Sequence, residues 1–380
     1  MRRTRRHAPL LALAVAVVLA ACGDGGTAPT TTVAGRPSST DPTTATTATT
    51  ATTAPGPVPY DRPTPSRRVG TGFLDGVSLD GRAVFVEEEH PDFAQPGCEG
   101  QPEPVLSRVT LAAGARELLA TKAFPLRGEV VPGPGGRVVL VDGCEGFLSR
   151  LVVGSAAADG RLRDLRVVPL AEAPNLGAGT FSWSRDGSAL VAATVPVEGD
   201  PAVVRVDPRT GSLRPLFGVA GLGGVLLRVA ELEGDRYAVA GGGKVELRSA
   251  TGQRESAADG NDFAVTPDGR QVVVLGRTVA VLTVDGVHGP APLVPAIAGR
   301  EVSSADVSPD GRAVVYVSSA LGGADNRVRL VTLADRRVVE LTEPGQWGRA
   351  LFTGDGRAVV FNQFFEAPRF VPDLLVVAFG

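Results

Sequence analysis

Cysteine, histidine and lysine are scarce in this chain of 380 residues. It has three cysteines and three histidines, and its only lysines are Lys122 and Lys244. It contains no glycine-rich phosphate loop, no Gly-x-Ser-x-Gly nucleophile motif and no His-x-x-x-His spacing. These absences count against a nucleotide-binding fold, an α/β-hydrolase domain and a Cys/His metal centre. We therefore expect no catalytic residues, no metal and no cofactor, although enzymatic activity stays an open question.

The first 22 residues are typical of an export signal rather than of a folded segment. Four arginines precede the apolar run 10–21, whose twelve residues are fewer than the roughly 20 that span a bilayer. The run ends in Leu19-Ala20-Ala21-Cys22, which resembles the lipobox of bacterial lipoproteins. The resemblance implies cleavage before Cys22 and acylation of that residue. Two acyl chains hold a protein firmly at a membrane, so we expect a lipid-anchored protein on the extracytoplasmic side of the cell membrane.

A spacer follows the cysteine. Residues 22–65 are rich in Thr, Ala and Pro, a composition that cannot form a packed core, so we expect a disordered linker there. Without residues 1–21, the chain has 34 basic and 41 acidic residues and a formal charge of −7. An acidic domain is a poor partner for nucleic acid. The expected organisation is a signal peptide at 1–21, the acylated linker at 22–65 and one domain at 66–380.

The most informative feature of the domain is a repeated tight turn between apolar runs. Ser308-Pro309-Asp310-Gly311-Arg312 precedes Ala313–Val317, and Asp-Gly between two such runs is a strong hairpin signal. Equivalent turn glycines are Gly81, Gly136, Gly187, Gly234, Gly269, Gly311 and Gly356, with spacings of 55, 51, 47, 35, 42 and 45 residues. Repeats of about 40–50 residues that contain several short strands are typical of β-propeller blades.

Each unit reads as four strands. Strand a precedes the turn, strand b follows it, and strands c and d come next, as in Val328–Leu333 followed by Val338–Thr342. We expect an all-β, seven-bladed β-propeller with four-stranded antiparallel blades. The last unit has only three strands before Gly380, so we expect residues between about 58 and 69 to supply the fourth beside Leu374–Phe379. The alternative is seven unrelated hairpins in a β-sandwich or β-helix.

The repeat resembles that of the TolB-like and WD-like propellers of bacterial proteins. The resemblance rests on the Ser-Pro-Asp-Gly-Arg turn at 308–312, the loop with Asp325-Asn326 and the strand that begins at Val328. It covers residues from about 70 to 380 and is weaker where Gly135 and Glu233 replace the turn aspartate. It implies partner binding in the envelope. No counterpart of the separate N-terminal domain of TolB is present, so the Tol role itself is not carried over.

Two cysteines remain after acylation, Cys98 and Cys144, each within Gly-Cys-Glu-Gly. Paired cysteines in exported proteins usually form disulfides. The repeat places both on b–c loops of adjacent units, on one face of the ring. We therefore expect a Cys98–Cys144 disulfide, with two free thiols as the alternative.

Most acidic residues have a plain structural interpretation. The turn aspartates, such as Asp310 and Asp268, are expected to form the turns, and Asp325-Asn326 is expected to be a loop. The run Glu87-Glu88-Glu89-His90 is expected to be a solvated loop rather than a metal site.

Three long b–c loops, at about 88–104, 319–327 and 363–372, would be neighbours on one face of a closed ring. They contain aromatic and charged residues, and such a cluster suggests a partner-binding surface. The alternative is that the aromatic residues only cover the sheet edges. The candidate partner-binding residues are Phe364, Phe365, Arg369, Phe370, His90, Asp92 and Phe93.

A propeller does not determine function. The first hypothesis is a monomeric, lipid-anchored scaffold or accessory factor that binds a protein partner in the cell envelope without catalysis. The second is a propeller enzyme, a lactonase-like hydrolase or a lyase, which would need polar or metal-binding groups that converge on the central channel. The third is an extracytoplasmic sensor that binds glycan or peptide.

Overall fold

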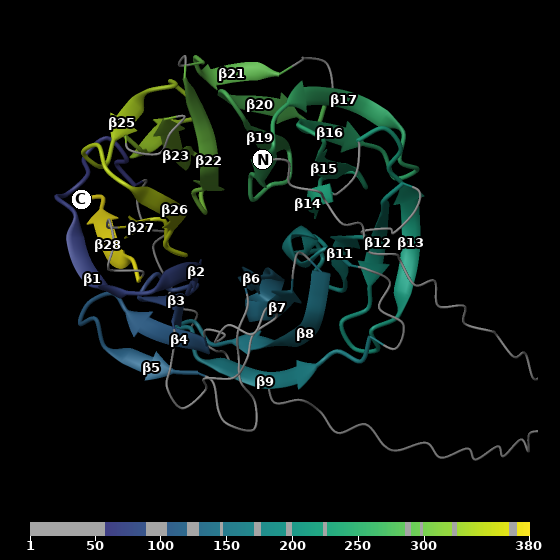
Figure 1. Cartoon of the computed structure of the whole chain (residues 1–380), viewed down its shortest axis with the longest axis horizontal. Helices are drawn as coiled ribbons and strands as arrows, with labels where there is room; N and C mark the ends of the chain where they lie inside the picture. The colour runs from purple at the N-terminus through teal and green to yellow at the C-terminus, as the bar shows by residue number, and fades with distance from the viewer. Residues whose placement is uncertain are drawn as a thin grey trace, which may run out of the picture. The chain divides into compact units, whose positions relative to one another are not determined.

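The structure is a computed structural model of the whole chain. It describes residues 58–88, 105–119, 129–144, 147–170, 176–194, 200–222, 226–285, 290–296, 299–320, 325–364 and 371–380. Seven separate four-stranded antiparallel sheets surround a central axis, so the predicted seven-bladed propeller is confirmed (Figure 1). In the described part of the chain, no helix is long and apolar enough to cross a membrane.

In blades 1 to 3 the strands follow chain order from the axis outward. Two short 3-10 turns, η2 (Pro134–Gly136) and η3 (Ala178–Thr180), belong to blades 2 and 3. Blade 1 contains β2 (Phe73–Val77), β3 (Ala83–Glu88), β4 (Val105–Thr110) and β5 (Arg116–Leu118); blade 2 contains β6 (Glu129–Pro132), β7 (Arg137–Cys144), β8 (Phe147–Ala156) and β9 (Leu162–Val167); blade 3 contains β10 (Ser182–Trp183), β11 (Leu190–Ala193), β12 (Ala202–Val206) and β13 (Leu213–Gly218).

Blades 4 to 6 repeat this order, and blade 7 is completed by the N-terminal strand. Blade 4 contains β14 (Leu226–Glu231), β15 (Tyr237–Gly241), β16 (Lys244–Arg248) and β17 (Arg254–Asp259); blade 5 contains β18 (Asp262–Val265), β19 (Gln271–Leu275), β20 (Val279–Thr283) and β21 (Ala291–Val294); blade 6 contains β22 (Arg300–Val307), β23 (Ala313–Ala320), β24 (Arg327–Thr332) and β25 (Val338–Glu340); blade 7 contains β26 (Trp347–Phe352), β27 (Ala358–Gln363), β28 (Asp373–Ala378) and β1 (Arg67–Thr71).

The a–b turns form as the sequence predicts. The glycines at the seven turn positions have positive φ, for example 68° at Gly311. In blade 6 the Ser308 hydroxyl donates to Asp310 Oδ1 at 2.6 Å, and the same oxygen accepts from the Arg312 amide at 3.1 Å. The same hydrogen bond from a hydroxyl to the turn aspartate forms in four other blades, between Ser78 and Asp80, Ser184 and Asp186, Thr266 and Asp268, and Thr353 and Asp355. The turn aspartates are therefore structural, as expected.

The core is divided among the interfaces between blades. Seven clusters of buried side chains each join two adjacent blades, and most of their members are Val, Leu and Ala from strands a, b and c. Strand β19, with Val272, Val273 and Val274 all buried, supplies clusters on both of its faces. Such strands are covered on both sides, which explains the continuous β-branched runs after each turn.

The ring is closed by the N-terminal segment. Strand β1 pairs antiparallel with β28 as the fourth strand of blade 7, which confirms the predicted closure, although β1 extends two residues beyond the expected range. Buried Asn362 on β27 reinforces the junction: its Oδ1 accepts from the Leu74 amide at 3.0 Å, and its Nδ2 donates to the Gly72 carbonyl at 2.8 Å. An otherwise open sheet edge is thereby paired.

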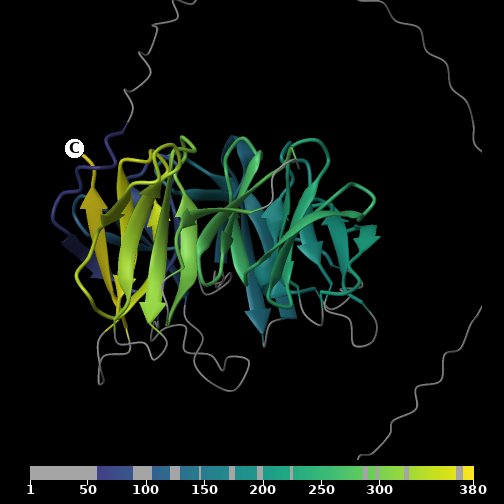
Figure 2. The ribbon, with the colours of Figure 1, turned by 90° about the horizontal axis from the view of Figure 1, so that it is seen from above.

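The strands run between two faces of the disk (Figure 2). We call the face with the Asp-Gly turns the turn face and the opposite one the b–c face. Because strand a runs toward its turn, the first residues of each a strand lie at the b–c face. The chain enters on the turn face, where the Tyr60 hydroxyl donates to Asp310 in the blade 6 turn at 3.0 Å.

Candidate functional site

Of the residues that the sequence suggested for a site, the structure describes few. Phe364 directly follows β27, and its ring centroid lies 6.2 Å from that of Phe73. Cys144 ends β7, but its side chain lies outside the described part of the molecule. Eight other candidate residues also lie outside the described part of the chain: Cys22, Cys98, Phe365, Arg369, Phe370, His90, Asp92 and Phe93. The lipidation site, the disulfide and most of the proposed loop surface therefore stay predictions.

The expectation of a solvated loop at the acidic run is wrong for its first two residues. Glu87 and Glu88 are the last residues of β3. The Glu88 carboxylate accepts from the Ser107 hydroxyl at 2.9 Å and forms an ion pair with Arg116. The strand continues because its register with β4 is maintained through Glu88, which pairs with Val105. Glu89 and His90 lie outside the described residues.

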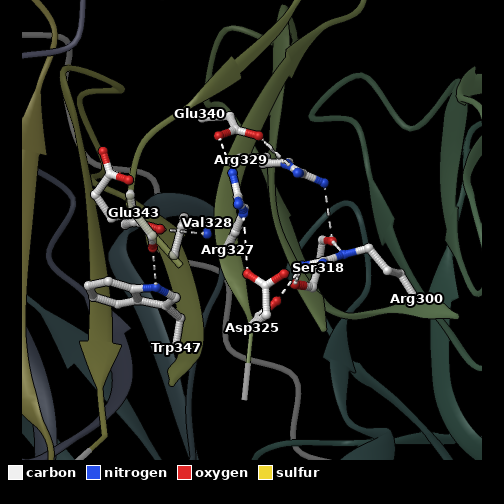
Figure 3. Close-up of polar contacts among 10 residues, drawn as sticks. Arg300, Ser318, Asp325, Arg327, Val328, Arg329, Glu340, Glu343 and Trp347 are labelled. Carbon is white, nitrogen blue, oxygen red and sulfur yellow. Dashed lines mark hydrogen bonds and ion pairs between the residues drawn. The ribbon is translucent and has the colours of Figure 1, made fainter. Parts of the chain in front are cut away.

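The Asp325-Asn326 loop is held by charges and hydrogen bonds within blade 6 (Figure 3). Asp325 accepts from Arg300 at 3.0 Å and from Arg327 at 3.4 Å, and this pairing holds the pKa of its carboxyl below the ordinary value. Glu340 accepts from Arg327 and Arg329. The Ser318 hydroxyl accepts from Arg300 and Arg329.

The neighbouring backbone and Trp347 complete this arrangement. The Val328 amide donates to Thr342, and the indole of Trp347 donates to the Glu343 carbonyl at 2.8 Å. The guanidinium groups of the cluster are thus engaged with oxygens of the same blade. We assign this cluster to the rigidity of blade 6, not to ligand binding.

The central channel has the strongest features of a site. It contains a cavity of about 700 Å³, lined by the inner strands and the segments that lead into them. Six blades contribute a polar or charged residue to the lining at one level, six or seven residues before the turn glycine. These residues are Asp75, Glu129, Arg228, Asp262, Ser304 and Arg349. We call them the channel ring. A pocket of this volume is typical of small-molecule sites.

β-Bulges shape the ring. Register shifts occur in β2 around Asp75, in β22 around Ser303 and in β26 around Gly348 and Arg349. A bulge adds one residue to a strand, bends it and changes the direction of the side chains. Asp75 and Arg349 are among the extra residues at these bulges, and both line the channel.

Two ion pairs cross between blades within the ring. Arg349 lies 2.7 Å from Glu129, and Arg228 lies 3.4 Å from Asp262. The Arg228 guanidinium also lies 5.8 Å from the centroid of the Phe263 ring, where a cation–π contact is favourable. Both arginines of the ring therefore have an acidic partner on another blade.

Asp75 differs from these paired groups. Its Oδ2 is fully covered and has no hydrogen-bond partner. Burial, followed by repulsion from Glu87 on the adjacent strand, raises the pKa of Asp75 to about 8. Glu129 acts in the same direction and Arg349 in the opposite one. The Asp75 carboxyl consequently holds a proton near neutral pH and can release it.

Asp306 lies one step further along the channel. Burial raises the pKa of its carboxyl, but Asp306 accepts from its neighbour Val307 and from Phe352, both at 2.9 Å. These contacts join blade 6 to blade 7, so Asp306 has a structural role.

A second hollow, of about 890 Å³, lies between blades 7 and 1 near the turn face. It is larger than the channel cavity, but its charged residues are already engaged. Arg108 contacts Glu117 at 3.3 Å, and Arg67 donates to the Leu111 carbonyl at 3.0 Å. Arg82, whose side chain is 84% exposed, lies 4.0 Å from Asp80. We therefore regard the channel as the better candidate.

Sequence reasoning missed the channel ring. A signal was present, because the ring residues recur at a nearly constant distance before the turn glycines. That distance identifies equivalent positions on the inner strands, so it could have drawn attention to Asp75 and Glu129. The bulges and the pairing across blades had no comparable signal.

No protein-family model and no curated protein matches this chain. Among solved structures, TolB from Acinetobacter baumannii is similar over 70% of this chain, with 15% sequence identity and a TM-score of 0.45. The matched region spans 65% of that protein, less than two thirds of its length. A likeness of this degree does not extend to function.

Proposed function

We propose that this protein is a lipid-anchored, non-catalytic binding module of the cell envelope. In this proposal a partner protein docks on the b–c face at blades 7 and 1. The observation that carries it is an apolar corner formed by Phe73, Phe364 and Val371. We call these three residues the apolar corner.

The apolar corner combines two segments that are far apart in sequence. Phe73 is 42% exposed at the start of β2, and Val371, just before β28, is 39% exposed. The Gly72 amide donates to the Pro372 carbonyl at 3.0 Å, which places the two segments side by side. Exposed aromatic and apolar side chains that gather at one place favour a protein interface. The predicted partner-binding residues Phe365 and Phe370 are close to this corner in sequence.

The anchor is supported by sequence alone, through the order of arginines, apolar run and Cys22. The entry of the chain is compatible with it, because Tyr60 and Asp310 lie on the turn face and the described residues before β1 stay near that face. A partner can then approach the apolar corner without displacing that segment.

The docking surface is tested with the variant Phe73→Ala/Phe364→Ala. Envelope proteins that cross-link to the wild type are captured from membranes and compared with those captured by the variant. We expect loss of the specific partner and a melting temperature within about 2 °C, since both rings are partly exposed. Val167→Ala removes a similarly exposed side chain from the outer strand of blade 2 and should retain the partner. An unchanged partner set with the double variant would contradict the proposal.

The anchor is tested separately. Cys22→Ser should move the protein from the membrane fraction to the soluble extracytoplasmic fraction, because the acyl chains cannot be attached. If this variant stays as firmly bound to the membrane as the wild type, the anchor assignment is wrong.

The channel supports a second candidate, an enzyme such as a lyase or a lactonase-like hydrolase. Polar groups converge there, and Asp75 can transfer a proton near neutral pH while Arg349 lies near it. Turnover of lactones or uronic-acid polymers that Asp75→Asn abolishes would favour this candidate. No turnover with the wild type, after metal analysis and supplementation, would reject it.

A further inference from the structure

The central channel contains a cavity of the size of a small-molecule site. With about 700 Å³ it can hold a small organic molecule, and its lining comes from β2, β6, β14, β18, β22 and β26. The ring that surrounds it has both signs of charge. The nature of a ligand therefore depends on which of these charges has no partner.

Carboxyl groups outnumber guanidinium groups in the cavity lining. Asp75, Glu129, Asp262 and Asp306 face two guanidinium groups, those of Arg228 and Arg349. Each arginine is paired with one carboxylate, Glu129 or Asp262, and Asp306 accepts from two backbone amides. Asp75 remains, with one oxygen that accepts no hydrogen bond. A buried acceptor without a partner costs free energy, so this carboxyl is the least well satisfied acidic group of the cavity.

The surroundings of Asp75 favour positive charge. Burial is the largest cause of the raised pKa of Asp75; Glu87 on β3 and Glu129 on β6 raise it further, and Arg349 on β26 only partly offsets their repulsion. The other charged groups of the cavity are Arg228 on β14, Asp262 on β18 and Asp306 on β22. A cation beside Asp75 would stabilise its ionised form and take the place of the proton.

The arrangement suits an organic cation better than a metal ion. Among the residues that the structure describes, no group of three or more His, Cys, Asp or Glu side chains is placed to hold a metal. An ammonium or guanidinium group needs only one or two carboxylate acceptors and presents several donors. Asp75 is among the residues that line the cavity, so its carboxyl can meet such a group there.

We propose that the central channel binds an organic cation, a primary ammonium or guanidinium group, at Asp75. The carboxyl proton passes to solvent as the cation binds. The cation belongs either to a free small amine or to a lysine or arginine side chain of a bound peptide. This site is separate from the apolar corner and does not depend on the docking proposed there.

The test is isothermal titration calorimetry on the purified full chain. The probes are putrescine and agmatine as free cations, the peptide acetyl-Gly-Lys-Gly-amide as the side-chain form, and N-butylacetamide as an uncharged control. We expect at least one cationic probe to bind and the control not to bind. Binding only of the free amines identifies a small molecule, and binding only of the peptide identifies a partner side chain. Failure of all three cations overturns the proposal.

The pH dependence identifies the group. Affinity should rise about tenfold per pH unit from pH 6 to 7.5 and level off above pH 8, because only ionised Asp75 binds the cation. Titrations in two buffers with different ionisation enthalpies should give close to one proton released per cation at pH 6.5. An affinity independent of pH overturns the assignment.

Matched variants complete the test. Asp75→Asn should weaken binding at least tenfold, whereas Asp262→Asn, the same substitution on the other side of the ring, should alter it less than threefold. Equal losses in both variants would mean that the net charge of the channel attracts the cation without a site at Asp75. The Phe73→Ala/Phe364→Ala variant should keep cation binding, so failure of the docking proposal and failure of this one are distinguishable.

Discussion

Arg349 on β26 and Glu129 on β6 form an ion pair of 2.7 Å although their strands belong to blades 7 and 2. Blade 1 lies between these blades, and its inner strand carries Asp75. The ion pair therefore spans the inner edge of blade 1, which lies next to blade 7, where the ring closes. Its electrostatic effect falls on Asp75, since Arg349 stabilises the ionised carboxyl and Glu129 opposes ionisation.

Arg349→Gln should raise the pKa of Asp75 above about 8, because the substitution removes the cation that favours the charged form. The free energy of unfolding should change by less than about 1 kcal/mol, since both partners are partly exposed. Carboxyl ¹³C chemical shifts followed against pH would report the pKa. An unchanged or lowered pKa would show that Arg349 does not act on Asp75.

Asp75→Asn should change how stability depends on pH. In the folded protein the pKa of Asp75 is about 8, and in the unfolded chain it is near the ordinary 3.8. Between these values the folded state binds the proton and the unfolded state does not, so the stability of the wild type falls as pH rises from about 4 to 8. The asparagine does not titrate, and the variant should therefore gain stability relative to the wild type over this window.

The size of that gain can reach about 1.4 kcal/mol per pH unit. Urea unfolding of both proteins at pH 5, 6, 7 and 8 would measure it. If the free energy of unfolding changes with pH by the same amount in both proteins, the raised pKa of Asp75 is contradicted.

The fold could be predicted because its determinants are local. The Ser/Thr-x-Asp-Gly turn is built from contacts within six residues, such as Ser308 to Asp310 and the Ala313 amide to Ser308. The five turns with this motif can therefore be recognised in the sequence without knowledge of their neighbours. The closing strand could be predicted for a different reason, since blade 7 lacked a fourth strand and an open edge is unfavourable.

The site could not be predicted in the same way. Asp75 is acidic in the sequence like many other residues, and its pKa is set by burial and by Glu87, Glu129 and Arg349 on three other strands. Glu87 approaches through the β2–β3 hairpin and Glu129 comes from blade 2, whereas Arg349 in blade 7 comes close only when the ring closes. The bulge at Asp75 also depends on the pairing of β2 with β3, which the turn motif does not specify.

Cys98 and Cys144 should form a disulfide in exported protein, as their matching Gly-Cys-Glu-Gly segments predict. In the chain-entropy model, closing this loop would stabilise the domain by about 4 kcal/mol. Non-reducing peptide mapping after blocking free thiols would identify the linked peptides. Recovery of both cysteines as blocked thiols would reject the pairing.

Tyr60 should be essential for closure of the ring. Its side chain is 3% exposed, and its ring makes edge contacts with Phe352 and Phe379 at centroid distances of 5.7 and 5.3 Å. Tyr60→Ala should lower the free energy of unfolding by about 3–5 kcal/mol through loss of this packing. Tyr60→Phe removes only the hydroxyl that donates to Asp310, so its cost should be about 1 kcal/mol.

Two deletions separate the closing segment from the linker that precedes it. Deletion of residues 56–70 removes Tyr60 and most of β1, and should destabilise the domain by several kcal/mol because the pairing with β28 is lost along with the packing of Tyr60. Deletion of residues 27–53 should leave the urea midpoint unchanged. Since β1 satisfies the outer edge of β28, the first deletion should also increase aggregation at high protein concentration. If the two deletions have equal midpoints, β1 does not stabilise the ring, and blade 7 must be stable with three strands.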